Sequence, residues 1–258
     1  MAVTGFATAL ALSAGRGTGA ILVAAAVLSG QLSVGWSNDY IDRARDRTAA
    51  RMDKPIVAGS VSARLVWRCA LVAAAACVPL SMLSGWRAGL VHLGAVAMAW
   101  MYNLSLKNTA ASVVPYALAF GALPIFVSLG LSGHPLPPGW AITAAALLGA
   151  GAHFVNTLPD LGDDALTGVR GLPHRLGPRL SLIGGTVLMA SATATLAVFP
   201  RGRLGPLGTA LIVGAFAAIG GVIVSALSGH PRAAWSLTLC AAGLTVAVYL
   251  ANGTALRS

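Results

Sequence analysis

The chain has 258 residues, of which 57% are hydrophobic and only 9% are charged, against about 25% charged residues in an average soluble domain. This composition excludes a water-soluble globular domain and predicts a protein built mainly of membrane-spanning helices. The formal net charge of +10 does not indicate a nucleic-acid partner, because the basic residues lie in short segments between long apolar runs.

Nine apolar segments follow one another along the chain. We predict helices at residues 2–14, 19–37, 62–84, 88–105, 110–131, 140–158, 180–199, 207–228 and 234–251. All but the first are about long enough to cross a bilayer, which takes roughly 17 to 25 residues. The expected fold is therefore all-α: a single integral membrane domain over residues 1–258 that forms a polytopic bundle of about nine helices.

The first segment is too short to span a bilayer by itself, and we expect a tilted or truncated first helix there. No basic residue precedes Arg16, so the segment lacks the positively charged start of a signal peptide. Alternation of the spans places the loops 38–61, 106–109, 159–179 and 229–233 on one side of the membrane. Twelve of the 17 Lys and Arg residues fall on that side, so the positive-inside rule makes it the cytoplasmic face of a cell membrane.

The acidic residues are all aspartates, and they fall in two of the predicted cytoplasmic loops or in the helix ends that lead into them. The seven are Asp39, Asp42, Asp46, Asp53, Asp160, Asp163 and Asp164. If the first cluster is helical, Asp39, Asp42 and Asp46 lie within an arc of about 60°, with Asn38 beside Asp42. Carboxylates this close repel one another unless a cation lies between them.

The second cluster, "NTLPDLGDD", repeats this arrangement. Asn156, Asp160 and Asp164 are spaced four residues apart, Asp163 lies close to the same face, and Pro159 is expected to end or bend the helix. Aspartate and asparagine oxygens are hard ligands that suit Mg²⁺, which takes one or two carboxylates together with water and substrate phosphates. Two such clusters facing one another predict a site for Mg²⁺ and a diphosphate.

Basic residues follow each cluster. They are Arg43, Arg45, Arg47, Arg51 and Lys54 after the first, and Arg170, Arg175 and Arg179 after the second. Interleaved carboxylates and basic groups fit a metal-bridged oligophosphate, because the basic groups take up charge on a leaving phosphate. The remainder of such a substrate would be a lipid held between helices. The alternative is a solvated loop with surface ion pairs, which explains one cluster well and two clusters of the same design poorly.

These motifs resemble those of the UbiA superfamily of membrane prenyltransferases. "NDYIDRARD" resembles the N-D-x-x-D-x-x-x-D signature of that superfamily, and "DLGDD" matches its second motif, D-x-x-x-D. "RMDKPIVAG", "MYNLSLKNT" and "GVRGLPHRLG" resemble the stretches that follow the first motif, the fourth helix and the second motif. The resemblance covers nearly the whole chain. The first segment is shorter than in the superfamily, and the second motif lacks the charged residues that many members carry between its aspartates.

The resemblance implies a nine-helix bundle with a central cavity that opens to the lipid, where an isoprenyl diphosphate binds through Mg²⁺ to both motifs. An acceptor, often an aromatic ring such as 4-hydroxybenzoate or a quinone precursor, then attacks the allylic cation. The implied metal-binding residues are Asn38, Asp39, Asp42, Asp46, Asp160, Asp163 and Asp164. The implied diphosphate-binding residues are Asn38, Arg47, Arg51, Lys54, Tyr102, Lys107, Asn156 and Arg170. The implied catalytic residues are Asp42, Asp160, Asp164 and Lys107.

Three other functions fit part of the pattern. A terpene cyclase would use the same site and let the cation close on its own chain. A transporter also uses charged groups, but these normally lie near the middle of the membrane in broken helices, whereas the aspartates here lie at one face. A phosphotransferase for CDP-linked lipids would carry a compact D-x-x-D-G-x-x-A-R pattern, which "DDALTG" does not complete.

Four residues inside the predicted spans have two possible roles. His92 and His153 are either functional, as ionisable residues within a membrane often are, or hydrogen-bonded across helices. Tyr116 and Trp100 either line the cavity or pack within the bundle.

Overall fold

The computed structural model describes residues 2–162, 168–200 and 205–257. Over these residues the chain forms nine α-helices and short 3₁₀ turns, with no β-strand. The α-helices are α1 (Ala2–Ser13), α2 (Gly19–Thr48), α3 (Ala63–Met82), α4 (Trp86–Leu104), α5 (Val114–Leu129), α6 (Gly139–Thr157), α8 (Leu172–Val198), α9 (Pro206–Leu227) and α10 (Pro231–Ala251). The 3₁₀ turns are η1 (Leu106–Asn108), η2 (Ala110–Val113), η3 (Leu158–Asp160) and η4 (Gly253–Arg257). The predicted all-α fold is confirmed.

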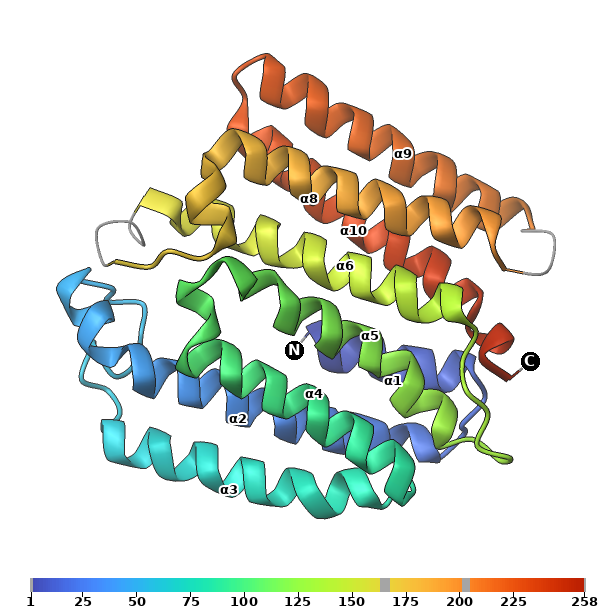
Figure 1. Cartoon of the computed structure of the whole chain (residues 1–258), viewed down its shortest axis with the longest axis horizontal. Helices are drawn as coiled ribbons and strands as arrows, with labels where there is room; N and C mark the ends of the chain where they lie inside the picture. Colours follow the sequence, from blue (N-terminus) through green and yellow to red (C-terminus); the bar gives the residue numbers. More distant parts are fainter. Residues whose placement is uncertain (1, 163–167, 201–204, 258) are drawn as a thin grey trace.

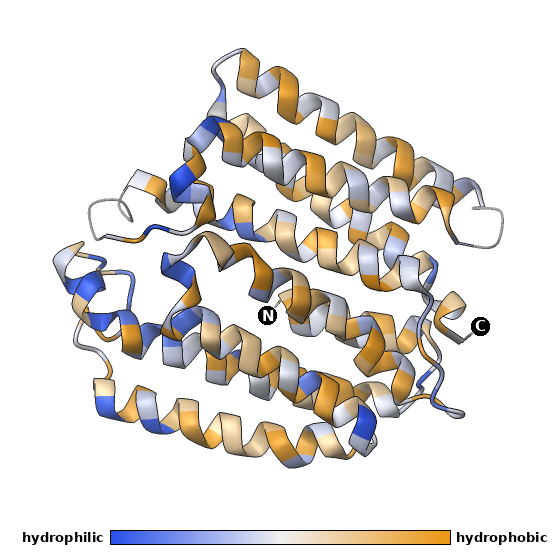
Figure 2. Ribbon diagram, in the orientation of Figure 1, coloured by the Kyte–Doolittle hydropathy of each residue, from blue (hydrophilic) through white to orange (hydrophobic). Residues whose placement is uncertain are grey.

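The helices lie side by side with their long axes roughly aligned (Figure 1). Most helices pack on the helix that follows them in the chain, as α2 does on α3, α5 on α6 and α9 on α10. The connections α2–α3, α4–α5, α6–α8 and α9–α10 consequently lie at one end of the bundle. Figure 2 shows that polar residues gather there, while the helix bodies are mostly apolar. We call this end the motif end, because it carries residues 38–54 and 156–160.

Six helical segments among the described residues are long and apolar enough to cross a membrane. They are Gly19–Thr48, Ala63–Met82, Ala110–Leu129, Leu172–Val198, Pro206–Leu227 and Arg232–Ala251. Helices α4 and α6 have 19 residues each and coincide with the spans predicted at 88–105 and 140–158. The chain is therefore a multi-pass membrane protein.

The short helix α1 packs inside the bundle. Its residues Ala7 and Leu10 are fully buried, and Phe6 contacts Tyr249 of α10 edge to face, with ring centroids 5.5 Å apart. The hydroxyl of Tyr249 in turn donates a hydrogen bond of 2.7 Å to the carbonyl oxygen of Ala141 in α6. A buried phenol needs such a partner, so this residue joins α10 and α6 while its ring contacts α1.

Helix α2 is longer than the sequence predicts. The expected end at residue 37 is wrong, because α2 continues to Thr48. Residues 38–48 contain neither glycine nor proline, and their charged side chains bond within the helix. The guanidinium of Arg45, for example, donates to the carboxylate of Asp42 one turn earlier at 2.8 Å, a spacing that favours the helix. The first acidic cluster therefore lies on a helix and not in a loop.

Helix α8 begins earlier than residue 180, where the sequence predicts its start. It starts at Leu172, but Gly177 interrupts it with φ 77° and ψ 174°. Glycine adopts positive φ at little cost, and Pro178 fits the first position of the continuous helix that follows, where no backbone N–H is needed. The chain therefore bends at the motif end before it enters the longer part of α8.

The close packing of α5 on α6 depends on Gly149. A Cβ atom on this residue would lie 2.5 Å from the carbonyl oxygen of Tyr116 and 2.6 Å from Cβ of Phe120. These are contacts with the α5 backbone and the root of a side chain, which cannot rotate away. Small residues of this kind allow helices to approach in lipid, where no hydrophobic force drives them together.

Gly149→Ala should force α5 and α6 apart and lower the melting temperature of the purified protein in detergent. Overpacking of this kind costs about 1–3 kcal/mol. The matched control is Gly94→Ala in α4, where a Cβ would meet no atom within 4 Å and where alanine favours the helix by roughly 0.5–1 kcal/mol. If thermal unfolding shows the two variants to be equally stable, the packing role of Gly149 is wrong.

Candidate active site

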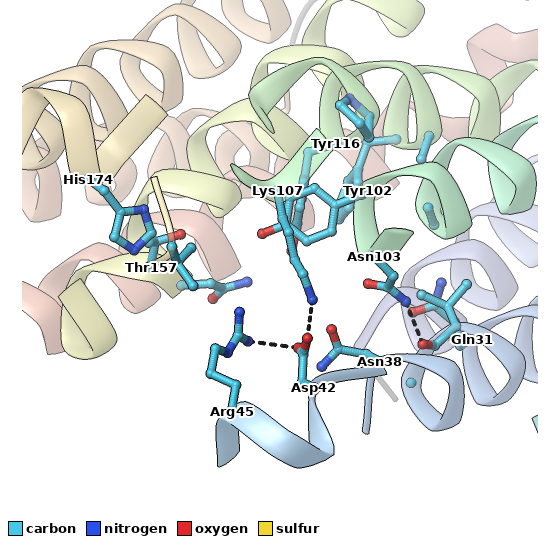
Figure 3. Close-up of a pocket in the computed structure, with 18 of the residues that line it drawn as sticks. Gln31, Asn38, Asp42, Arg45, Tyr102, Asn103, Lys107, Tyr116, Thr157 and His174 are labelled. Carbon is cyan, nitrogen blue, oxygen red and sulfur yellow. Dashed lines mark hydrogen bonds and ion pairs between the residues drawn. The ribbon is translucent and has the colours of Figure 1, made fainter. Parts of the chain in front are cut away.

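A cavity of about 390 Å³ lies at the motif end, with walls from α2, α4, η1, α5, α6 and the start of α8 (Figure 3). Its polar lining consists of Gln31, Asn38, Asp42, Arg45, Arg51, Tyr102, Asn103, Lys107, Asn156, Thr157 and His174. Its apolar lining includes Val34, Ala99, Pro115, Tyr116, Ala119 and Phe120. A charged region and an apolar region thus share one cavity.

Asp42 is the most constrained charged group of this cavity. It is only 5% exposed, and each carboxylate oxygen has a basic partner (Figure 3). Lys107 of η1 donates to Oδ1, and Arg45 donates to Oδ2 at 2.8 Å. Burying a carboxylate is costly unless it is paired and hydrogen-bonded, so these two cations make the position of Asp42 tolerable. Burial lowers the pKa of Lys107, while its hydrogen bond to Asp42 acts in the opposite direction.

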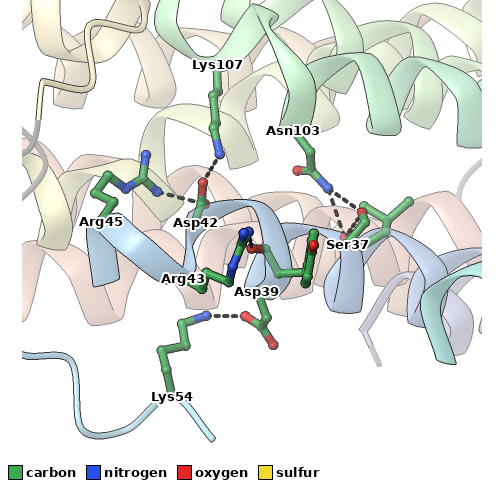
Figure 4. Close-up of polar contacts among 10 residues, drawn as sticks. Ser37, Asp39, Asp42, Arg43, Arg45, Lys54, Asn103 and Lys107 are labelled. Carbon is green, nitrogen blue, oxygen red and sulfur yellow. Dashed lines mark hydrogen bonds and ion pairs between the residues drawn. The ribbon is translucent and has the colours of Figure 1, made fainter. Parts of the chain in front are cut away.

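The aspartates of the first cluster do not all point into the cavity. Asp39 accepts a hydrogen bond of 2.8 Å from Nζ of Lys54, and Figure 4 shows this pair on another side of α2 from Asp42. Asp46 is buried, at 4% exposure, but does not belong to the cavity lining. Asn38 and Asp42 do line the cavity. The metal-binding roles of Asp39 and Asp46 stay predictions.

The second cluster is described only in part. Asn156, near the end of α6, lines the cavity together with Thr157. The backbone of Asp160 closes η3, but its side chain is outside the description, and Asp163 and Asp164 lie outside the described residues. Their metal-binding and catalytic roles stay predictions. Within the described ranges no three His, Cys, Asp or Glu side chains gather into a metal site.

The predicted diphosphate-binding residues fall into two groups. Those that line the cavity are Asn38, Arg51, Tyr102, Lys107 and Asn156. Arg47, Lys54 and Arg170 are not part of the lining. Arg47 and Arg170 are exposed, and Lys54 is paired with Asp39. The binding roles of these three residues stay predictions that the geometry does not test.

Four further polar residues line the cavity although the sequence analysis assigns them no role: Gln31, Asn103, Thr157 and His174. Asn103 and Thr157 directly follow the predicted site residues Tyr102 and Asn156. Their place in the sequence could therefore have indicated that they lie near the site. His174 lies within the segment "GVRGLPHRLG", and Gln31 lies seven residues before Asn38 on the same helix, but neither position by itself indicates a cavity.

His92 and Trp100 take part in contacts between helices. The imidazole of His92 lies 2.7 Å from the hydroxyl of Ser81 in α3 and stacks on the ring of Phe126, with centroids 4.7 Å apart. The indole of Trp100 donates to the hydroxyl of Ser33 in α2 at 3.2 Å. These bonds favour a packing role for both residues, whereas Tyr116 lines the cavity.

Ser112 of η2 connects three segments beside the cavity. Its fully buried hydroxyl accepts a hydrogen bond of 2.8 Å from the backbone N–H of Leu172 and lies 2.9 Å from Nε2 of His153. Next to it, a Cβ atom on Gly171 would lie 2.7 Å from the carbonyl oxygen of Lys107. The chain that follows the second cluster is therefore held against α6 and against the turn that carries Lys107.

The amino-acid sequence of the chain is similar to a known protein family and to individual proteins of known function. Residues 1–238 match the model of a family described as the UbiA prenyltransferase family. The chain is similar to the bacteriochlorophyll synthase 33 kDa chain of Cereibacter sphaeroides, with 33% identity over 64% of this chain and 58% of that protein. It is also similar to digeranylgeranylglyceryl phosphate synthase of Pyrococcus abyssi, with 29% identity over 55% of this chain and 51% of that protein. The chain spans about half the length of the curated relatives it matches.

Solved structures share the fold. The apo structure of a UbiA homolog from Aeropyrum pernix K1 superposes with a TM-score of 0.76 at 24% identity, over 95% of this chain and 94% of that one. A UbiA homolog from Archaeoglobus fulgidus bound to DMAPP and Mg²⁺ superposes with a TM-score of 0.72 at 22% identity, over 99% and 96% of the two chains. At these identities the likeness establishes the arrangement of the helices.

Ser112→Ala should destabilise the motif end. The substitution leaves the N–H of Leu172 without its acceptor and removes the partner of His153, and an unsatisfied buried polar group costs about 1–3 kcal/mol. We expect a lower melting temperature in detergent than for the unaltered protein. The matched control is Ser105→Ala, because the exposed hydroxyl of Ser105 bonds to the carbonyl of Met101 in its own helix. Equal melting temperatures for the two variants would contradict the connecting role of Ser112.

Proposed function

The chain belongs to the UbiA prenyltransferase family, since residues 1–238 match the family model, and we propose that it is a Mg²⁺-dependent membrane prenyltransferase. It would ionise an isoprenyl diphosphate and transfer the prenyl group to an acceptor. The observation that carries this proposal is the placement of Asp42, a carboxylate of the first motif buried at the cavity with Lys107 and Arg45 as partners. Solvated surface ion pairs would not be buried in this way.

The residues of the first motif that line the cavity fit a magnesium ion by their chemistry. Asn38 and Asp42 offer hard oxygen ligands, and Mg²⁺ binds through one or two carboxylates plus substrate phosphates. Asp160 and Asp164 would supply the carboxylates of the second motif, with Asp39, Asp46 and Asp163 as further or neighbouring ligands. When bound, the metal supplies positive charge that stabilises the departing diphosphate.

Three basic side chains would hold the diphosphate in the same cavity. Arg45, Arg51 and Lys107 all belong to its lining, so phosphate oxygens there would meet two guanidinium groups and one ammonium group. The negative charge that develops on the leaving group is then stabilised by groups already in place. Tyr102 and Asn156 add hydrogen-bonding groups at the rim of the charged region. Arg47, Lys54 and Arg170 would act from outside the lining.

The apolar region of the cavity would hold the prenyl chain. When the carbon–oxygen bond breaks, its electron pair leaves with the diphosphate, and the allylic cation has to be kept from water. Val34, Pro115 and Ala119 would keep water from this region, and the rings of Tyr116 and Phe120, which also line the cavity, would stabilise a neighbouring cation. The acceptor would then supply the electron pair of the new bond to the allylic carbon and lose a proton to water.

We infer an aromatic or lipid acceptor without fixing its identity. The two curated relatives are named as synthases of chemically different products, so membership of the family leaves the acceptor open. The basic residues concentrated at the motif end support a cytoplasmic location for the site, by the positive-inside rule.

The direct test uses purified protein in detergent with labelled prenyl diphosphates of several lengths and a panel of aromatic acceptors. We expect a prenylated acceptor that forms with Mg²⁺ and not with EDTA. Diphosphate release with a cyclised hydrocarbon and no prenylated acceptor would favour the terpene cyclase. Absence of binding and turnover under all of these conditions would overturn the proposal.

Asp42→Ala and Asp160→Ala should each reduce turnover by at least about 100-fold, the effect of losing a group that stabilises the transition state electrostatically. Asp42→Asn, which keeps the size of the side chain, separates loss of charge from loss of packing. The control is Asp53→Ala, because the side chain of Asp53 is 65% exposed and does not line the cavity, although its Oδ2 lies 3.5 Å from Nη2 of Arg51. Full activity in both alanine variants would refute the assignment of the metal site.

A further inference from the structure

A second cavity of about 780 Å³ lies at the motif end, outside the candidate active site. It is formed where the end of α6 and η3 meet the bend in α8 and the turn between α9 and α10. Its lining includes Leu158, Pro159, Arg179, Leu182, Arg232 and Trp235. None of these residues lines the candidate active site, so the two cavities are separate features of the same end of the bundle.

The backbone shapes this cavity. Gly177, with φ 77°, offsets the first residues of α8 from its continuous part, which leaves room beside Pro178. Gly229, with φ 73°, makes the turn from α9 into α10. Both glycines adopt a conformation that other residues rarely take, so the hollow is a product of two fixed bends.

The lining of the second cavity suits an amphiphilic ligand. Its walls are mostly apolar, and Arg179 of α8 and Arg232 of α10 are both exposed. Neither arginine forms an ion pair with another described residue, and no acidic residue occurs among the described lining. A ligand with one anionic group and an apolar body would satisfy both the charges and the walls.

The position of the second cavity relative to the membrane narrows the choice of ligand. It lies at the end of membrane-spanning helices, where the bilayer meets water, and Trp235, which is 41% exposed, is of the residue type that prefers this depth. Arginine side chains at helix ends keep their charged groups at the boundary between bilayer and water while their aliphatic stems contact apolar surface. Basic pockets between helices on the cytoplasmic side bind the head groups of anionic lipids.

We propose that the second cavity binds an anionic phospholipid from the surrounding leaflet. The phosphate contacts Arg179 and Arg232, and an acyl chain follows the apolar wall along Leu182 and Trp235. A zwitterionic lipid brings a positive group that the two guanidinium groups disfavour, and a free phosphate ion leaves the apolar wall unoccupied. None of these observations depends on the proposed enzymatic activity.

Occupation of this site has a consequence for the neighbouring motif. Leu158 and Pro159, which line the second cavity, directly precede Asp160. A bound lipid packs against η3 at the point where the second acidic cluster begins.

The test measures lipid retention on the full chain, purified in a neutral detergent, by native mass spectrometry. Equimolar dioleoylphosphatidylglycerol and dioleoylphosphatidylcholine are added, and we expect the unaltered protein to retain the phosphatidylglycerol preferentially. Each basic group near a membrane surface contributes about 1 kcal/mol. Arg179→Gln and Arg232→Gln should therefore each weaken the apparent affinity for phosphatidylglycerol about fivefold, and together about 30-fold.

The matched control is Arg64→Gln, an exposed arginine at the start of α3, at the same end of the bundle, that lines neither cavity. It should leave retention of phosphatidylglycerol unchanged. Equal losses in all three single variants would show a general effect of surface charge and overturn the proposal. So would equal retention of the two lipids by the unaltered protein, a test that needs no variant. Displacement of phosphatidylglycerol by glycerol 3-phosphate alone would assign the site to a soluble phosphate ester instead.

Discussion

The buried carboxylate of Asp42 is the constraint on which the candidate active site depends. A charge removed from water must be matched by opposite charge and hydrogen bonds within the protein. Lys107 and Arg45 provide both, and Lys107 comes from the connection between α4 and α5, far from α2 in the sequence. The pairing therefore fixes the first motif against the opposite wall of the cavity. It also leaves two cations beside the carboxylate, which is the mixture of charges that a metal-bridged diphosphate requires.

The two halves of the site are joined by short turns. The turn η1 places Lys107, and η2, a few residues later, places Ser112 against His153 of α6 and against the backbone at Leu172. Because Gly171 has no side chain, the backbone at this residue can approach the carbonyl oxygen of Lys107 closely. Side chains in these turns are supported by buried hydrogen bonds, and groups held in this way need little rearrangement when charge develops on a substrate.

Both cavities lie at the motif end, but they differ in whether their basic side chains have an acidic partner. In the candidate active site Arg45 and Lys107 already have a carboxylate partner in Asp42, and a substrate has to compete with it or bring a metal. In the second cavity, Arg179 and Arg232 stand beside an apolar wall with no acidic residue in the described lining. The first arrangement suits a reacting diphosphate bridged by a cation, and the second suits an anion that is itself attached to an apolar chain.

The sequence by itself determined the fold class, the approximate positions of the spans, the two motifs and the family resemblance, because apolar length and residue spacing are local properties. It also indicated that Asn38, Asp42, Tyr102 and Lys107 belong together. Only the tertiary structure decided that α2 continues through the first motif, that Asp39 faces Lys54 while Asp42 faces Lys107, and that Gln31 and His174 reach the cavity. A helical spacing places side chains within an arc, but the direction that each one takes depends on partners supplied by distant segments. Those partners are brought together by the packing of the helices, which the pattern of apolar residues along one chain does not specify.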